Sequence, residues 1–320
     1  MGIEPGARCE VWSPCKLNPS LGILGKREDG MHEVQTTLLA LDRCDRVRVE
    51  LCELAPGEPP VSLTASGPAC SPDIPLNASN LAWRGAQVAL QLAQEGGLDV
   101  QHLGLRLQLE KHVPSQAGLG GGSSNAAAAA YAVAKLLGLS PDAPELLERL
   151  GSLGADVPFF LGARHTGWGL CRGRGERVEA RELPPMDARV FVIWTPRLTC
   201  STAAVYAALE PGELHAELQT EGFEDCLSLP LEAARRAFRN DLQAAALRSH
   251  AGLAKLLEAL GELGPGVVGL CGSGSSCFGM FDSHATAVEL LNETKARRIE
   301  RDFGLRAQFI ARARGAGVGE

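Results

Sequence analysis

Leucines alternate with other residues from 103 to 109, at Leu103, Leu105, Leu107 and Leu109. This period of two predicts a strand with one buried face. A glycine-rich stretch follows at 114–125, and an alanine- and leucine-rich segment then runs from Ala126 to Leu137 and stops at Gly138. Alanine and leucine favour helix, and a glycine just past the last turn is a common stop signal. The pattern therefore predicts a strand, a glycine loop and a helix in succession.

Hydrophobic spacing elsewhere predicts an alternation of helices and strands, which indicates a mixed α and β protein. We expect helices at 81–95, 143–150, 231–250 and 252–263, strands at 190–194 and 266–281, the second interrupted by a glycine and serine cluster, and a surface loop at 56–75. A polar, proline-bearing stretch at 177–187 separates two regions that each carry both kinds of element. It predicts two domains, residues 1–185 and 186–320.

Composition limits the class of protein. The chain has 320 residues, enough for two domains of about 150. With 45% hydrophobic and 22% charged residues it is not mainly disordered. A net charge of −7 disfavours nucleic acid as a partner. The amino terminus lacks the apolar core of a signal peptide, and the longest apolar run, 126–134, is shorter than the roughly 18 residues of a membrane span. We expect a soluble cytoplasmic protein with no membrane partner and no obligatory protein partner.

Metal and hydrolase chemistry find little support in the sequence. The ten cysteines contain no C-x-x-C pair, so reduced thiols are favoured over a zinc ribbon or a redox motif. His32 and Glu33 begin H-E-V-Q-T, which lacks the second histidine of a zinc helix. The cluster at 271–276 has no serine at the centre of G-x-S-x-G.

The segment G-L-G-G-G-S-S-N, from Gly118 to Asn125, ends where the alanine-rich helix is expected to begin. Glycines let a backbone fold closely around a ligand, and the free N–H groups of a helix start attract anions. No lysine follows the glycines and Ser123 occupies the sixth position, so this is neither a Walker A loop nor a dinucleotide fingerprint. A turn capped by a serine is the alternative, but four glycines within five residues favour a phosphate site.

Two charged residues indicate a function only when they are considered together with the other motifs. Asp156, in G-A-D-V-P-F-F, is by local chemistry more typical of a helix or turn cap, and Lys16, in S-P-C-K-L-N, of a surface lysine. Together with G-K-R-E-D-G-M-H-E at 25–33, P-S-Q-A-G-L-G-G-G-S-S-N at 114–125, N-D-L at 240–242 and G-S-G-S-S at 272–276, these motifs resemble, in this order, the galactokinase, homoserine, mevalonate and phosphomevalonate (GHMP) kinase superfamily.

The resemblance covers roughly residues 10–285. It implies an α+β, two-domain fold, with an amino-terminal domain like the second domain of ribosomal protein S5 and a ferredoxin-like carboxy-terminal domain. It also implies ATP and Mg²⁺ as cosubstrates, with the active site between the domains.

The resemblance also implies roles for individual residues, according to their positions in the motifs. Asp156 would accept the proton of the acceptor hydroxyl, and Lys16 would orient that carboxylate and offset charge. The resemblance assigns ATP binding to Pro114, Gln116, Ala117, Gly118, Leu119, Gly120, Gly121, Gly122, Ser123 and Ser124, with Asn80 and Lys111 near the adenosine. Ser123 or Ser124 would hold Mg²⁺. The positions matching acceptor-binding residues are Asn18, Met31, His32, Tyr206, Gly272, Ser273 and Gly274.

The P-x-K-L-N and D-G-x-H-E pair is similar to that of the member that phosphorylates a tertiary hydroxyl of a substrate carrying a cytidine diphosphate group, in the non-mevalonate route to isoprenoids. Two positions depart from its pattern: Gln116 replaces a common glycine, and Met31 replaces a tyrosine that stacks on cytosine. Alternatives are a homoserine or mevalonate kinase, a non-catalytic ATP-binding sensor of the same fold, and a bare phosphate-binding module.

Overall fold

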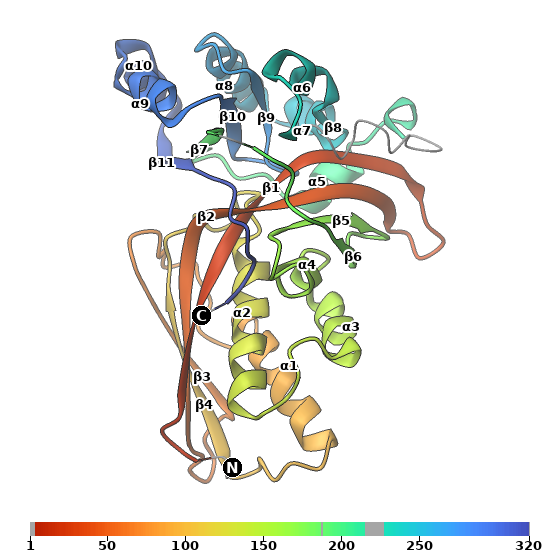
Figure 1. The fold of residues 1–320 in the computed structure, drawn as a ribbon, viewed down its shortest axis with the longest axis vertical. Helices are drawn as coiled ribbons and strands as arrows, with labels where there is room; N and C mark the ends of the chain where they lie inside the picture. The colour runs from red at the N-terminus through yellow and green to blue at the C-terminus, as the bar shows by residue number, and fades with distance from the viewer. Residues whose placement is uncertain (1–3, 187, 215–226, 320) are drawn as a thin grey trace.

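The computed structural model describes residues 4–186, 188–214 and 227–319. These residues form a seven-stranded sheet and a four-stranded sheet, each covered by helices (Figure 1). The first sheet has the order β3-β4-β2-β1-β8, with β5 paired to β2 and β6 to β5. Its strands are β1 (Arg8–Lys26), β2 (His32–Glu53), β3 (Val61–Ser66), β4 (Leu103–Glu110), β5 (Trp168–Arg172), β6 (Arg177–Ala180) and β8 (Arg239–Asn240).

Four helices accompany the first sheet: α1 (Leu81–Glu95), α2 (Gly121–Leu136), α3 (Pro144–Leu153) and α4 (Val157–Gly162). Helix α1 connects β3 to β4, which are parallel neighbours. The alanine-rich α2 packs closely on α1, and at their crossing a Cβ on Gly85 would lie 2.2 Å from the carbonyl oxygen of Ala126. Small side chains on α2 therefore let these helices approach closely.

The second sheet has the order β11-β7-β10-β9 and is antiparallel. Its strands are β7 (Val190–Pro196), β9 (Val267–Leu270), β10 (Cys277–Phe281) and β11 (Leu305–Ala311). Between them lie α5 (Thr202–Ala207), the 3₁₀ turn η1 (Pro211–Glu213), α6 (Leu231–Ala237), α7 (Leu242–Ser249), α8 (Ala251–Gly261), α9 (His284–Asn292) and α10 (Thr294–Phe303). The succession of strand, helices, two strands, helices and strand is ferredoxin-like, so the predicted α+β fold is confirmed.

The two sheets are tied together at the middle of the molecule. In Figure 1 the long strands β1 and β2 rise from the lower lobe and bend beneath the upper one. Leu17 and Leu39, from these strands, share a buried cluster with Phe191 and Phe278 of the second sheet. Strand β8 pairs with β1, and the carboxy-terminal residues 313 and 319 bridge back to 41 and 12. The domain boundary at residue 185 stays a prediction. Segments after it, β8 and the carboxy-terminal residues, return to the first sheet.

Several expected elements are found with the expected bounds, and others are corrected. Helix α1 and strand β4 occupy the expected positions, whereas α2 begins at Gly121 rather than Ala126. The helix expected over 231–250 is divided into α6 and α7 by β8. The stretch 56–75 is not entirely a loop, because β3 runs through it and pairs with β4. Its alternating Val61, Leu63 and Ala65 outweigh the flanking prolines.

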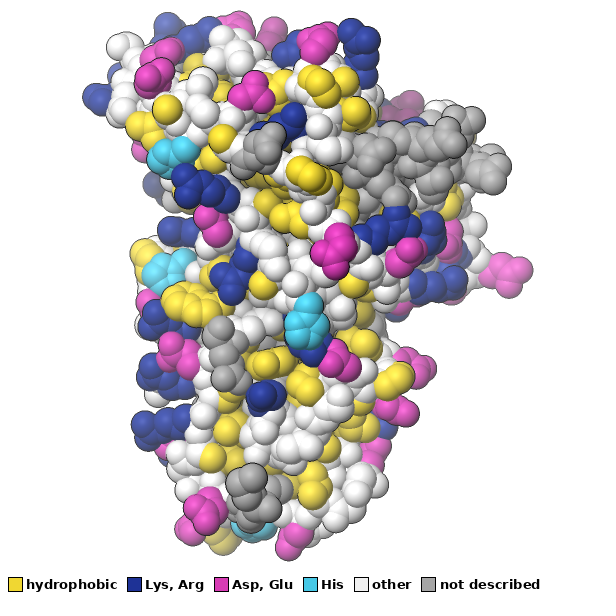
Figure 2. All heavy atoms as spheres, in the orientation of Figure 1, with side chains coloured by type: hydrophobic (Ala, Val, Ile, Leu, Met, Phe, Trp, Pro, Cys, Tyr) yellow, Lys and Arg dark blue, Asp and Glu magenta, His cyan; other side chains and the backbone are white. Residues whose placement is uncertain are grey.

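The outer face of the first sheet carries paired charges. Arg48 contacts Glu10 across β1 and β2, and Arg106 contacts Glu50 across β2 and β4. Figure 2 shows basic and acidic side chains alternating down the lower left edge of the molecule, where Figure 1 places this sheet. None of the nine cysteines in the described ranges forms a disulfide. Within those ranges, no helix has both the length and the apolar character needed to cross a membrane.

Candidate active site

Lys16 and Asp156 face each other near the start of α4. Lys16 Nζ lies 3.5 Å from Oδ2 of Asp156, and their side chains are 6% and 31% exposed. Lys16 follows an irregularity in the register of β1 with β2, and such bulges redirect side chains beside active sites. Asp156 precedes α4, but its carboxylate makes no capping hydrogen bond among the described residues. The helix-cap interpretation is therefore not supported, and the carboxylate is available to a ligand.

A buried chain of polar groups fixes Lys16. Its ammonium donates to Oδ1 of Asn18 at 2.7 Å, and Asn18 Nδ2 donates to the Thr36 hydroxyl at 2.9 Å. Thr36 in turn donates to the Ser20 carbonyl at 2.6 Å. Because each donor has a defined acceptor, the position of the ammonium is set by the pairing of β1 with β2. Sequence reasoning predicted Asn18 but not Thr36.

The glycine loop ends in a helix start that has no side-chain cap. Gly120 occupies the N-cap of α2 with φ 68°, so the predicted alternative of a serine cap is wrong. A Cβ there would lie 2.7 Å from Cγ of Lys16. The first N–H groups of α2 have no partner within the helix, and the helix dipole adds positive potential at this end. The loop therefore forms an anion cradle beside Lys16, as expected of a phosphate site.

A loop of the second sheet, residues 271–276, closes against the glycine loop. A Cβ on Gly118 would lie 2.1 Å from the Cys271 carbonyl oxygen, so only glycine permits this approach. The Ser276 N–H donates to the Ala117 carbonyl at 3.1 Å. The side chain of Asn240, in the N-D-L motif, donates to the Gly272 carbonyl at 2.8 Å and accepts from the first N–H of α7 at 3.1 Å.

These groups surround a cavity of about 410 Å³. Its walls include both partners of the Lys16–Asp156 pair and much of the glycine loop. Of the predicted site residues, those lining it are Lys16, Asn18, Pro114, Gln116, Ala117, Gly118, Leu119, Gly120, Gly121, Gly122, Ser123, Asp156, Tyr206, Gly272 and Ser273. The fold thus brings together residues predicted from four separate motifs, together with Tyr206.

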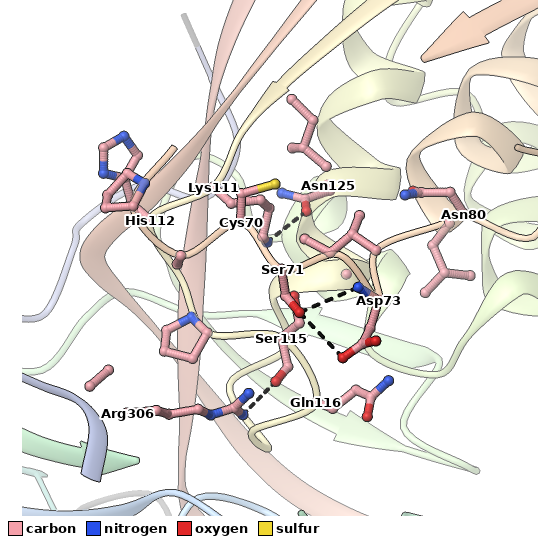
Figure 3. A pocket seen from close by; sticks show the side chains of 18 of the residues that line it. Cys70, Ser71, Asp73, Asn80, Lys111, His112, Ser115, Gln116, Asn125 and Arg306 are labelled. Carbon is pink, nitrogen blue, oxygen red and sulfur yellow. Dashed lines mark hydrogen bonds between the residues drawn. The ribbon is translucent and has the colours of Figure 1, made fainter. Parts of the chain in front are cut away.

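A second cavity of about 750 Å³ adjoins the first, and Leu81, Pro114, Gln116 and Gly122 line both. Figure 3 shows Lys111 and Asn80 on its walls, with Arg306 of β11 reaching Ser115 from the second sheet. Asn80 is the N-cap of α1, where its side chain accepts from the Ala82 N–H at 2.9 Å. This cavity has the position and size for a nucleoside attached to phosphates held by α2.

Lys111 belongs to a buried network centred on Asp45. Asp45 contacts the Lys111 ammonium in a buried ion pair and accepts from the Asn125 amide at 2.9 Å. It also accepts from the His112 and Val113 N–H groups at 2.6 and 2.8 Å. Sequence reasoning missed Asp45, because a carboxylate in the charged run D-R-C-D-R-V-R is typical of a solvated strand. Its burial follows from the approach of α2 and the end of β4.

The two candidate magnesium ligands lie in different surroundings. Ser124 is fully buried, and its hydroxyl accepts from Ser13 at 2.8 Å. Ser123 lines the smaller cavity together with Asp156. No group of three or more histidine, cysteine or acidic side chains in the described ranges could hold a metal ion. A hydroxyl and a carboxylate beside a phosphate cradle nevertheless suit Mg²⁺, which binds largely through substrate phosphates and water.

The predicted base-binding residues lie beside the β1–β2 turn. The rings of His32 and Tyr206 have centroids 5.0 Å apart, tilted by 36°. Burial and the nearby Lys26 lower the pKa of His32, so the ring is neutral at pH 7 and offers one donor and one acceptor. Burial and Asp156 raise the pKa of Tyr206, which remains protonated. Tyr206 lines the smaller cavity, whereas His32 and the 50% exposed Met31 are not among the residues that line either cavity.

The arrangement can bind a nucleoside polyphosphate at α2 and bring a hydroxyl to Asp156. A carboxylate that accepts a proton, with a cation beside it, is the chemistry needed for phosphoryl transfer to an alcohol. Comparison with known proteins agrees. Models of the "GHMP kinases N terminal domain" and "GHMP kinases C terminal" match residues 80–163 and 223–298.

Curated relatives and solved structures agree with these matches. A 4-diphosphocytidyl-2-C-methyl-D-erythritol kinase of Thermus thermophilus is 36% identical over 85% of this chain and 87% of its own. A crystal structure of 4-(cytidine 5'-diphospho)-2C-methyl-D-erythritol kinase has a TM-score of 0.71 at 31% identity, covering 95% of this chain and 98% of that one. Homoserine kinase from Cytophaga hutchinsonii shares the fold, with a TM-score of 0.71 at 17% identity over 100% and 98% of the two chains.

The fold and the site are thus those of an ATP-dependent small-molecule kinase of the GHMP class. Within that class, this chain belongs to the 4-diphosphocytidyl-2-C-methyl-D-erythritol kinase family.

Proposed function

We propose that this chain transfers the γ-phosphoryl group of ATP, with Mg²⁺, to the 2-hydroxyl of 4-diphosphocytidyl-2-C-methyl-D-erythritol. The products are the 2-phosphate and ADP, and the reaction belongs to the non-mevalonate pathway of isoprenoid biosynthesis. The observation that carries this proposal is the 3.5 Å approach of Lys16 to Asp156 in a cavity that also contains the α2 cradle and Tyr206. Phosphate, acceptor hydroxyl and base can then all be bound at one site.

The residues divide the chemistry between them. Asp156 accepts the proton of the acceptor hydroxyl, and Lys16 orients that carboxylate and offsets negative charge. The N–H groups of the 118–123 segment stabilise negative charge on the transferring phosphoryl group. The Asp45 network supports Lys111 and the α2 start, and so fixes the nucleotide side of the site. ATP supplies the phosphoryl group, and Mg²⁺ would neutralise its phosphate oxygens, with Ser123 as the hydroxyl available to it.

The base side distinguishes this acceptor from others of the superfamily. The neutral ring of His32 can both donate to and accept from the edge of a cytosine, while Tyr206 offers a ring face. Mevalonate and homoserine have no base to fill this space. The pairing of these rings therefore favours a cytidylyl acceptor.

The test is phosphate transfer to three acceptors side by side: the cytidylyl substrate, mevalonate and homoserine. ADP release and the mass of the phosphorylated product are measured together. We expect transfer to the cytidylyl substrate only. Transfer only to mevalonate or homoserine overturns the assigned acceptor, and ATP binding without transfer to any of them identifies a sensor.

A further inference from the structure

The reacting hydroxyl and the base of the proposed acceptor are joined by a diphosphate, and Arg174 lines the cavity that also contains the Lys16–Asp156 pair and Tyr206. Lys16 and Arg174 are the basic side chains among the described residues that line the smaller cavity. Lys16 is engaged with Asn18 and Asp156 at the reacting end. Arg174 is therefore a second basic side chain, available for the negative charges of the diphosphate.

Hydrogen bonds attach the turn that carries Arg174 to the base side. The Val34 N–H donates to the Gly173 carbonyl at 2.6 Å, and the Gly173 N–H donates to Glu33 at 3.2 Å. These two partners directly follow His32 on β2. The glutamate of the D-G-x-H-E motif thus has a structural role, which is to hold the 172–176 turn beside the base site.

Packing attaches the same turn to the reacting side. A Cβ on Gly175 would lie 3.4 Å from Cβ of Ala155, the residue before Asp156. Arg174 therefore lies between two anchored glycines. Gly175 packs near the residue that precedes Asp156, and Gly173 is hydrogen-bonded to the residues that follow His32. A group that bridges the two sites can reach this side chain, which lines the cavity.

The guanidinium retains donors for such a group. Its Nη2 donates to the Gly151 carbonyl at 3.3 Å, and its Nε lies 3.8 Å from Oε2 of Glu176. A guanidinium has five N–H donors, so most remain for a ligand. The Arg174 side chain is 34% exposed and so is accessible to a ligand, while the turn fixes its backbone. Planar donor pairs of this kind suit phosphate oxygens.

We propose that Arg174 binds the diphosphate of the acceptor and selects cytidine diphosphate derivatives over uncharged cytidine compounds. This inference rests on the proposed function. It deepens that function by assigning a residue to the part of the substrate that neither the Lys16–Asp156 pair nor the His32–Tyr206 pair contacts.

The experiment compares Arg174→Gln, Arg174→Lys and the matched control Arg172→Gln. Arg172 is two residues away, pairs with Glu179 at 3.1 Å and is not among the residues lining the cavity. Cytidine and CDP are each tested as competitors of the cytidylyl substrate at saturating ATP. KM for ATP and the melting temperature are measured for every variant.

We expect wild type to bind CDP more tightly than cytidine. Arg174→Gln should weaken CDP by about 10- to 100-fold, as for charge-assisted hydrogen bonds, while cytidine and KM for ATP change less than about twofold. Arg174→Lys should retain part of the preference for CDP, and Arg172→Gln all of it.

Equal weakening of cytidine and CDP in Arg174→Gln, or no change in either, overturns the proposal. A rise in KM for ATP alone assigns Arg174 to the ATP phosphates and overturns it as well. If Arg174→Gln does not fold, a reduced CDP preference in Arg174→Lys supports the proposal and full retention contradicts it. Absence of transfer to the cytidylyl substrate by wild type contradicts the proposed function instead.

Discussion

The ammonium of Lys16 and the carboxylate of Asp156 lie 3.5 Å apart, although one comes from the first strand and the other from the turn before α4. The lysine is buried and the carboxylate is partly open to the cavity. This asymmetry suits a fixed cation that orients a carboxylate able to reach a substrate.

Asp156→Asn should lower kcat by roughly 10²- to 10⁴-fold, the usual contribution of a positioned acid or base. An amide matches the carboxylate in size but does not accept the hydroxyl proton. Binding of ATP should be retained, because the phosphate cradle consists of backbone groups. Steady-state kinetics and nucleotide titration measure the two effects. Asp142→Asn, which removes a surface partner of Arg164, is the control, and wild-type turnover in Asp156→Asn would contradict the catalytic assignment.

Lys16→Met should also reduce kcat by about 10²-fold or more, because it removes the cation beside Asp156 and the donor to Asn18. The double variant with Asp156→Asn should lose little more than the worse single variant, since groups that act as a unit are not additive. A double-mutant cycle on kcat measures this. Losses that multiply would show that the two side chains act independently.

Gln116→Gly should stabilise the protein. Gln116 has φ 52°, in the left-handed region that costs a residue with a Cβ roughly 1–2 kcal/mol. Glycine removes that strain but adds freedom to the unfolded chain, worth roughly 0.5–1 kcal/mol. The net gain in the free energy of unfolding is about 0.5–1 kcal/mol, measured by chemical denaturation.

The control for this change is Gln101→Gly, an exposed turn residue without positive φ. It should be neutral or destabilising. A loss of stability in Gln116→Gly would mean that contacts of the glutamine side chain outweigh the backbone strain.

Hydrophobic periodicity correctly predicted the elements that bury one face in a regular pattern. The alternating leucines of β4 and the bounds of α1 are found where expected. Strands β1 and β2 were missed because residues 13–23 of β1 are buried without alternation, and because register irregularities break the period of two. Bulges of this kind are set by tertiary contacts and leave no periodic signal.

The site residues also divide into those that the sequence indicates and those that only tertiary contacts bring into place. Lys16 and Asp156 were predicted from the resemblance of their motifs to a kinase family, and the glycine loop from its four glycines before a predicted helix. Asp45 and Arg174 carry no such signal: each lies in a charged run that is ordinary for a surface. Their roles depend on which strands pair and which turns meet, and only the fold specifies that.

The last prediction concerns the base. If cytosine binds between Tyr206, His32 and Met31, most stacking should come from Tyr206, because a planar ring covers more of a base than the exposed thioether of Met31 does. Stacking of a base on an aromatic ring is worth about 1–3 kcal/mol. Tyr206→Ala should therefore raise KM for the cytidylyl substrate about 5- to 150-fold and leave KM for ATP nearly unchanged.

Tyr206 also packs against the core of the second sheet, and a purely structural role makes a different prediction. In that case Tyr206→Ala would lower the melting temperature and affect both substrates alike, whereas Tyr206→Phe, which keeps the ring, should retain KM and stability in either case. Adding Met31→Tyr to Tyr206→Ala should restore part of the affinity, because a second ring face becomes available at the β1–β2 turn. Equal losses for ATP and the cytidylyl substrate, with no recovery from Met31→Tyr, would show that Tyr206 supports the fold and does not bind the base.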